Sequence, residues 1–146
     1  PQILEKLLDY KLDIAFITGE PNHKDLIVLN KFDDDLYLVE SNNKKSANCL
    51  IGYKKDSSHY KFLVEYFIQN NNADFKTIFI ENYEVMLGCV KAGMGIAYVS
   101  KNIIDKYNYT YELKLTKIPN EPLTHLICRK DFIPMIGDYL KKIKLL

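Results

Sequence analysis

The chain has 146 residues, of which 47% are hydrophobic and 27% charged, as expected for one globular domain or two small lobes. Its formal net charge of +1 offers no electrostatic argument for a nucleic-acid-binding surface. No apolar run approaches the roughly 20 residues that cross a bilayer, so no contact with a membrane is expected.

Helical and extended patterns alternate along the chain. The expected helices lie around residues 3–8, 62–67, 86–93, 102–107 and 133–143. The expected strands lie around residues 13–17, 25–32, 36–39, 49–53, 75–80, 96–99 and 123–128. Most of these strands are apolar runs without alternation, which is typical of strands covered on both faces. The pattern predicts an α/β fold with mainly parallel strand pairing.

Two of the strands, 36–39 and 123–128, flank a self-contained block of alternating strands and helices. A block inserted between two passages of the chain indicates two lobes joined by a two-strand hinge. We therefore predict a first lobe from residues 1–39 and 124–146, and a second lobe from residues 40–123.

The segment from Glu81 to Ser100 has the clearest local pattern. Asn82 is a good helix N-cap, and Gly93 stands where a glycine commonly ends a helix. An unbroken apolar strand, 96–99, follows. A dinucleotide-binding loop needs the order strand, glycines, helix, and here the order is reversed. The glycines Gly93 and Gly95 therefore predict a tight turn and close packing.

Ligands of α/β folds bind where strands end and helices begin, because helix N-termini carry free N–H groups and a positive dipole end. Three loops have this position, and we expect them to converge on a ligand. The predicted binding residues are Thr18, Gly19, Tyr53, Ser57, Ser58, Asn82 and Tyr83. The alternative for each is purely structural: Asn82 can be only a cap, and Thr18 only a turn former.

Signatures of metal or nucleophilic chemistry are missing from the sequence. The three histidines are scattered without HExxH or Cys/His spacing, and no GxSxG is present. The three cysteines are far apart without a CxxC pair, which is typical of a reducing compartment, and the first residues show no signal-peptide pattern. We predict no metal, no cofactor, no catalytic residue and a cytoplasmic location.

Three segments resemble the effector-binding domain of LysR-type transcriptional regulators. They are LLDYKLDIAF at 7–16, DLYLV at 35–39 and LGCVKAGMGIAYV at 87–99. Their order and spacing match the family over essentially the whole chain. The resemblance implies two Rossmann-like lobes of the type 2 periplasmic-binding-protein kind. It also implies a small-molecule effector bound between the lobes and a homo-oligomer, a dimer or tetramer.

The chain departs from the family pattern in three ways. Tyr10 stands where the family commonly has glycine, and Ser100 where it has proline. The family's N-terminal winged helix-turn-helix and the first strand, helix and strand of its effector domain have no counterpart before Pro1. The resemblance thus implies a fragment with an incomplete first lobe, whose exposed sheet edge another copy covers, and DNA contact only through a domain absent from this chain.

The resulting expectation is an effector-sensing domain that binds a small, anionic metabolite and is not an enzyme. The alternative is a solute-binding protein of a transporter, which shares the two-lobed fold. A third alternative is an enzyme such as a dehydratase, for which Glu81 and Glu84 are the only acidic candidates near the predicted site.

Overall fold

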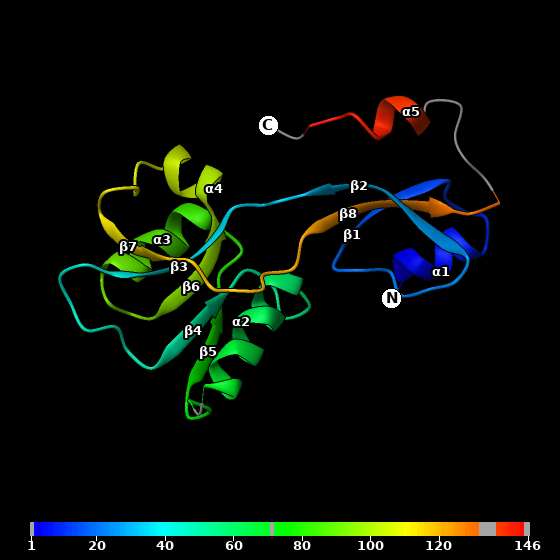
Figure 1. Cartoon of the computed structure of the whole chain (residues 1–146). Helices are drawn as coiled ribbons and strands as arrows, with labels where there is room; N and C mark the ends of the chain where they lie inside the picture. Colours follow the sequence, from blue (N-terminus) through cyan, green and yellow to red (C-terminus); the bar gives the residue numbers. More distant parts are fainter. Residues whose placement is uncertain (1, 71, 132–136, 145–146) are drawn as a thin grey trace. The chain divides into compact units, whose positions relative to one another are not determined.

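The computed structural model describes residues 2–70, 72–131 and 137–144. Its contacts divide the chain into unit 1, Pro1–Asp34 with Pro122–Leu146, and unit 2, Asp35–Glu121. The chain passes between the units at Asp34–Asp35 and at Glu121–Pro122, and we call these two links the crossings (Figure 1). Among the described residues, no helix has the length and apolar character needed to span a membrane.

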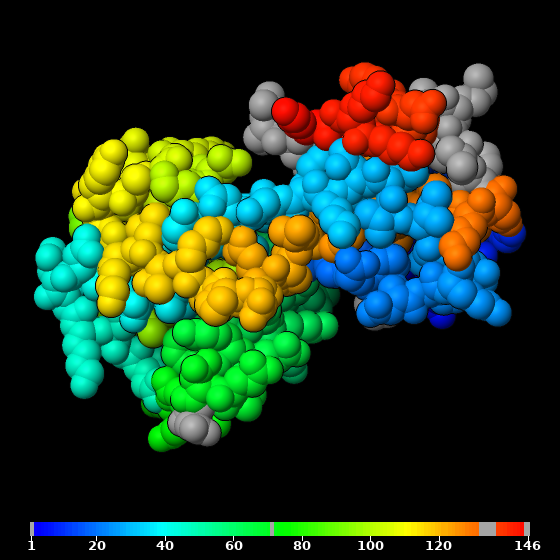
Figure 2. Space-filling model, in the orientation of Figure 1, coloured from blue at the N-terminus to red at the C-terminus, as the bar shows by residue number. Residues whose placement is uncertain are grey.

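Unit 1 is a small antiparallel sheet with a helix packed on each face. Its elements are α1 (Gln2–Leu8), β1 (Ile14–Thr18), β2 (Leu26–Phe32), β8 (Thr124–Arg129) and α5 (Gly137–Leu140). β8 lies between β1 and β2 and runs antiparallel to both. Ile127 packs with Leu7 of α1, whereas Leu126 and Cys128 pack with Leu140 of α5, which lies over β2 (Figure 2). Alternate residues of β8 therefore enter two small cores.

Tyr10 occupies a position where the family commonly has glycine, and its contacts explain this departure. Its backbone has φ +62°, a left-handed conformation that favours glycine, and it lies two residues after the end of α1. The Arg129 guanidinium stacks 4.1 Å from the centre of the Tyr10 ring, and the Tyr10 hydroxyl donates to Asp131. Buried Arg129 also donates to the carbonyls of Leu7 and Leu12, at 2.6 and 2.7 Å. The side chain of Tyr10 thus makes contacts that a glycine cannot make.

Unit 2 is a five-stranded sheet with helices on both faces. Its elements are β3 (Leu36–Ser41), β4 (Cys49–Gly52), α2 (Ser58–Gln69), β5 (Lys76–Phe79), α3 (Tyr83–Lys91), β6 (Ile96–Ser100), α4 (Lys101–Lys106) and β7 (Leu113–Thr116). The strand order is β5-β4-β6-β3-β7. β4 pairs in parallel with β5 and β6, whereas β3 runs antiparallel to β6 and β7.

The prediction of mainly parallel pairing was wrong for the chain as a whole. Among the described residues, two strand pairs are parallel and four antiparallel. Parallel neighbours need a crossover connection, usually a helix, and only β4-α2-β5 and β5-α3-β6 supply one. The strands next to the crossings, β2, β3 and β8, pair antiparallel with their neighbours.

In unit 2, β3, β4 and β6 are largely buried, as their apolar sequences predicted, whereas β5 is mostly exposed at the edge of the sheet. One face packs against α3 and α4, and its fully buried residues include Val39, Ile51, Leu87 and Ile104. The other face packs against α2 around Leu63. Each helix therefore has a fixed position on the sheet, and so do the loops at its ends.

Two elements of the structure differ from the sequence-based expectation. β7 was not predicted, because its four residues alternate Leu-Lys-Leu-Thr at an edge of the sheet and follow a loop rich in tyrosine. Of the helix expected around 133–143, residues 133–136 lie outside the described part of the chain. Within residues 137–144 the helix spans only Gly137–Leu140.

The ends of α3 follow the predicted local rules. The Asn82 side chain accepts a hydrogen bond from the Val85 amide at 3.0 Å. At the other end Gly93 has φ +80°, and the amides of Gly93 and Met94 donate to the carbonyls of Val90 and Cys89. This pair of bonds is a Schellman motif, so both ends of α3 are fixed by short-range contacts.

Replacing Asn82 with alanine is expected to lower the free energy of unfolding by about 1 kcal/mol, because the Val85 amide loses its acceptor. Asn82→Asp keeps a side-chain oxygen at the cap and is expected to retain most of that stability. Urea unfolding of the three proteins measures the difference. Equal losses in both variants would show that the cap does not stabilise α3.

Candidate functional site

Three helices of unit 2 begin at one edge of its sheet. β4, β5 and β6 are parallel, so their carboxyl ends lie together, and α2, α3 and α4 each begin after one of these ends. Helix N-termini favour anions. The edge therefore brings three positive dipole ends toward one region of unit 2.

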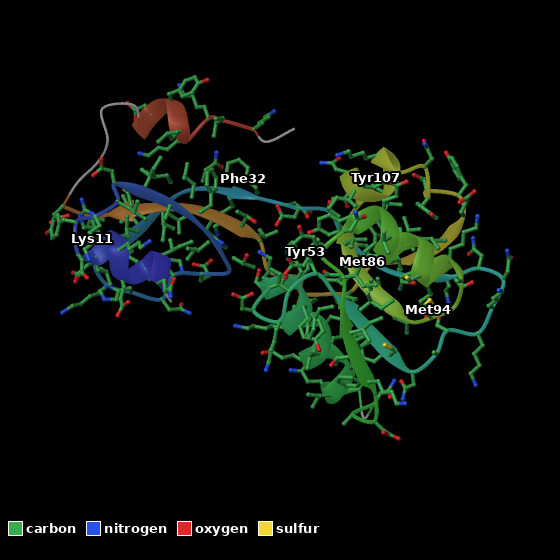
Figure 3. All side chains as sticks on the ribbon, turned by 180° about the vertical axis from the view of Figure 1, so that it is seen from behind. Lys11, Phe32, Tyr53, Met86, Met94 and Tyr107 are labelled. Carbon is green, nitrogen blue, oxygen red and sulfur yellow. The ribbon has the colours of Figure 1, made fainter. Side chains whose placement is uncertain are left out.

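Two tyrosines from neighbouring loops form a stack at this edge. Tyr53 follows β4 and Tyr83 is the first residue of α3, and their rings stack with centroids 4.6 Å apart and planes inclined by 20°. Figure 3 labels Tyr53 beside Met86, which lies one turn into α3. The Lys54 ammonium lies 5.9 Å from the centre of the Tyr53 ring, within the range of a weak cation–π contact. The stacked rings thus connect the loop before α2 with the start of α3.

A small pocket adjoins the stacked tyrosines. Its walls include Tyr53, Ser57 and Tyr83, which were predicted, and His59 and Tyr98, which were not. The space open to the centre of a water-sized sphere is about 10 Å³, which is room for roughly one water molecule. The pocket can therefore take the end of a small polar group, and anything larger must lie outside it along the edge.

The other predicted residues have different positions. Ser58 is the first residue of α2 and is exposed, and the Asn82 side chain caps α3. Thr18 ends β1, and the amide of Gly19 (φ +83°) donates to the carbonyl of Leu123 at 2.8 Å. Thr18 and Gly19 belong to unit 1, so the structure groups Tyr53, Ser57 and Tyr83 in one pocket and leaves the convergence of all seven residues a prediction.

Among the described residues, no group of three or more His, Cys, Asp or Glu side chains is placed to hold a metal ion. Cys49 and Cys89 are partly buried, Cys128 is buried, and none forms a disulfide. Burial raises the pKa of the Cys49 and Cys128 thiols, which lowers their reactivity at neutral pH. The site consequently offers hydroxyl groups, aromatic rings and helix N-termini.

The sequence profile of the family described as the LysR substrate binding domain matches residues 1–131. The chain belongs to this family. The match confirms the resemblance seen in the segments at 7–16, 35–39 and 87–99. It also assigns the fold to a class of ligand-binding domains.

The relatives of this LysR substrate-binding domain are regulators. The chain is 27% identical over 125 residues to the HTH-type transcriptional regulator SoxR of Arthrobacter sp. (strain TE1826), covering 82% of this chain and 43% of the relative. It is 24% identical over 152 residues to the HTH-type transcriptional regulator GltR of Bacillus subtilis (strain 168), covering 95% of this chain and 51% of the relative. The chain thus spans about half the length of the curated relatives that it matches.

Solved LysR regulatory domains share its fold. The MetR regulatory domain of N. meningitidis matches with a TM-score of 0.72 at 12% identity, over 97% of this chain and 75% of that one. The CcmR regulatory domain of Synechocystis PCC6803, solved in complex with 2-PG, matches with a TM-score of 0.67 at 15% identity, over 99% and 81%. The QuiR effector-binding domain, solved in complex with shikimate, gives 0.60 at 19%, over 97% and 73%. These likenesses confirm the two-lobed α/β fold.

Tyr83 in the LysR domain's pocket is a neutral phenol whose pKa is raised further by its surroundings. Burial of the Tyr83 phenol, together with the neighbouring Tyr53 hydroxyl, raises its pKa above the ordinary value of 10.0. A phenol with a raised pKa remains protonated at physiological pH and can donate a hydrogen bond to an anion. Tyr83 is therefore a donor beside two helix N-termini.

Tyr83 is expected to ionise above pH 10.0 in the folded domain, whereas the unfolded chain ionises near that value. The stability linked to this group is thus fully present below pH 10.0 and is lost as the pH rises through the folded pKa. Ultraviolet absorbance titrations of the wild type and Tyr83→Phe isolate the phenol, and Tyr53→Phe is expected to lower its pKa. Ionisation of Tyr83 at or below its ordinary pKa would contradict the burial argument.

The wall residues that the sequence did not predict include Tyr98 and His59. Tyr98 lies within β6, where the unbroken apolar run indicated only a buried strand, and His59 lies inside the first turn of α2. Each of these two residues has a polar group on its ring, and a buried tyrosine or histidine needs a polar partner. That need was the only signal in the sequence that could have indicated a polar pocket at these positions. The ring of His59 meets that of Tyr98 edge-on at 6.4 Å.

Proposed function

We propose that this chain is the effector-sensing part of a LysR-type transcriptional regulator and that it binds a small, anionic metabolite at the helix N-termini of unit 2. The main observation behind this proposal is the shared edge of the sheet in unit 2. There α2 and α3 begin around a pocket whose walls include Tyr53, Ser57 and Tyr83. Relatives of this chain in complex with 2-PG and with shikimate support a small-molecule ligand.

An anion fits the chemistry of the edge best. Two helix N-termini and a neutral phenol donor supply hydrogen bonds and positive potential without a buried cation. One oxygen of the ligand's charged group would enter the pocket, and the remaining atoms would lie outside it along the stacked rings of Tyr53 and Tyr83. This arrangement selects compounds with a compact anionic end.

Regulation would follow from differential binding. An effector that binds one conformation of the domain more tightly shifts the population toward it. We further propose that the regulator acts in the cytoplasm as a homo-oligomer. We also propose that it contacts DNA through an HTH domain, because its relatives are named HTH-type transcriptional regulators. The +1 net charge of this chain agrees with DNA contact by another part of the protein.

A thermal-unfolding screen tests the proposal. The panel contains small mono- and dicarboxylates, phosphate esters and amino acids, and the control panel contains the corresponding neutral amides and alcohols. A compound at 100 times its dissociation constant is expected to stabilise the domain by about 2.7 kcal/mol. Stabilisation by neutral compounds alone, or by none of either panel, would contradict the proposal.

A pair of variants localises the binding. Ser57→Ala removes a pocket hydroxyl that makes no capping bond to α2, so we expect binding to weaken by roughly tenfold with little change in stability. Thr116→Ala removes an exposed hydroxyl from β7, at the far edge of the sheet, and serves as the matched control. Equal affinities of the two variants would place the ligand elsewhere.

A further inference from the structure

A chain of polar contacts leads from the pocket to both crossings. Tyr98 lines the pocket and is 5% exposed, and its hydroxyl donates to Glu121 Oε2 at 3.0 Å. Glu121 Oε1 accepts from Lys117 Nζ at 3.0 Å, and Lys117 Nζ also pairs with Asp35 Oδ1 at 3.1 Å. All four residues belong to unit 2, so their mutual positions are set by one compact body.

The two carboxylates in this series of polar contacts lie at the two ends of unit 2. Asp35 is the first residue of unit 2 and directly follows one crossing. Glu121 is its last residue and directly precedes the other crossing. Lys117 therefore fastens the two crossings to each other. Its ammonium also lies 4.8 Å from the centre of the Tyr37 ring, which limits the positions that the ammonium can take.

The contacts differ in their shielding from water. The Glu121 side chain is 14% exposed, whereas those of Lys117 and Asp35 are 42% and 52% exposed. Partial burial lowers the pKa of Lys117, but hydrogen bonds to Glu121 and Asp35 outweigh it and raise the pKa above the ordinary 10.5. Lys117 is consequently charged at neutral pH, and the shielded Glu121 is the central member of the chain.

We infer that Tyr98, Glu121 and Lys117 form a relay through which the occupant of the pocket controls the freedom of the two crossings; this inference rests on the proposed function. An anion that accepts a hydrogen bond from the Tyr98 hydroxyl competes with Glu121 for that donor. Glu121 and Lys117 then lose one of their constraints. The relay thus has two states, and a ligand that favours one of them changes how the crossings move.

A merely structural role for the Tyr98 hydroxyl predicts a different outcome. Buried tyrosine hydroxyls need a partner, and in that case losing the bond would affect stability alone. The relay predicts an additional effect on the distance between the units, because Glu121 is joined covalently to Pro122. Motion between the units is therefore the readout that separates the two roles.

Pulsed electron paramagnetic resonance measures that motion without any ligand. Spin labels are attached at Lys24→Cys in unit 1 and Lys61→Cys in unit 2, both exposed. Cys49→Ser and Cys89→Ser remove the partly buried thiols. Buried Cys128, whose pKa is raised by burial, stays in place. The distance distribution between the labels reports on the crossings.

Tyr98→Phe keeps the ring in the pocket wall and removes only the hydroxyl, and Lys117→Met removes both ion pairs. We expect each to broaden the distance distribution and to raise the population outside its main peak by roughly twofold to tenfold, the range for losing one hydrogen bond. Lys117→Arg keeps the charge, so we expect its distance distribution to be as narrow as that of the wild type. Tyr109→Phe, a tyrosine packed in the opposite core of unit 2, is the control.

Two results would overturn the relay. One is a Tyr98→Phe distribution as narrow as that of the wild type, and the other is equal broadening in Tyr109→Phe. Since no ligand is used, these results are independent of the screen that tests the proposed function. Thermal unfolding of each labelled variant confirms that it is folded before its distances are compared.

Discussion

Replacing Leu87 with alanine is expected to lower the free energy of unfolding by about 2–5 kcal/mol, the usual range for emptying a buried leucine site. Leu87 lies on the inner face of α3, is fully buried, and packs in the core that joins α3 and α4 to the sheet. The same helix carries Asn82 and Tyr83 at its start. Loss of Leu87 should therefore weaken the candidate site together with the fold.

Val85 offers a matched control on the same helix. It is 52% exposed, so Val85→Ala is expected to change stability by no more than about 0.5 kcal/mol. Urea unfolding of both variants at equal protein concentration gives the comparison. A cost for Leu87→Ala no larger than that for Val85→Ala would show that α3 does not pack on the sheet as described.

Gly95→Ala is expected to cost about 1–3 kcal/mol, the usual range for overpacking a core. A Cβ atom at Gly95 would lie 2.7 Å from the carbonyl oxygen of Cys49 and 3.0 Å from Cγ1 of Ile51. The nearest obstacle is backbone of β4, which pairs with β6 in the centre of the sheet. The strands cannot separate there without breaking their ladder, so the substitution strains the fold.

Gly88→Ala is expected to change stability in the opposite direction to Gly95→Ala. Gly88 lies inside α3, and the nearest atom to a Cβ there is the Tyr109 hydroxyl at 3.6 Å, an ordinary contact. Alanine is a better helix former than glycine by roughly 0.5–1 kcal/mol, so this variant is expected to be more stable than the wild type. Thermal or urea unfolding that shows the same sign for Gly88→Ala and Gly95→Ala would refute the packing argument.

The segment from Asn82 to Val99 shows what local rules can predict. The cap, the apolar helix face, the glycine at the helix end and the buried strand are each decided by neighbours within a few residues, and all four appear in the structure. The close packing predicted for the glycines is confirmed at Gly95. Short-range rules suffice here because each contact spans one turn or one strand.

Contacts between distant residues could not be predicted in the same way. The apolar runs of β1 and β8 indicated burial, but burial does not distinguish antiparallel from parallel neighbours. Tyr98 and Glu121 are 23 residues apart in the chain, and nothing in either local sequence indicates their bond. Such pairings depend on how the sheet is assembled, which one sequence does not encode as a local pattern.

The candidate site was predictable to the extent that strand ends are predictable. Tyr53, Ser57 and Tyr83 were chosen because each follows a strand or starts a helix, and the structure places all three around one pocket. Tyr98 was missed because a buried strand was read only as core. The role of these residues in binding remains a proposal.

The most direct test of an effector site in unit 2 is a nuclear magnetic resonance titration of the isotopically labelled chain. The compound used is the carboxylate or phosphate ester that stabilises the domain most in the thermal screen. We predict saturable shifts at the first-turn amides of α2 and α3 and at the residues that follow β4, weakened in Ser57→Ala and unchanged in Thr116→Ala. Saturable shifts confined to unit 1 or to β7 would contradict the account.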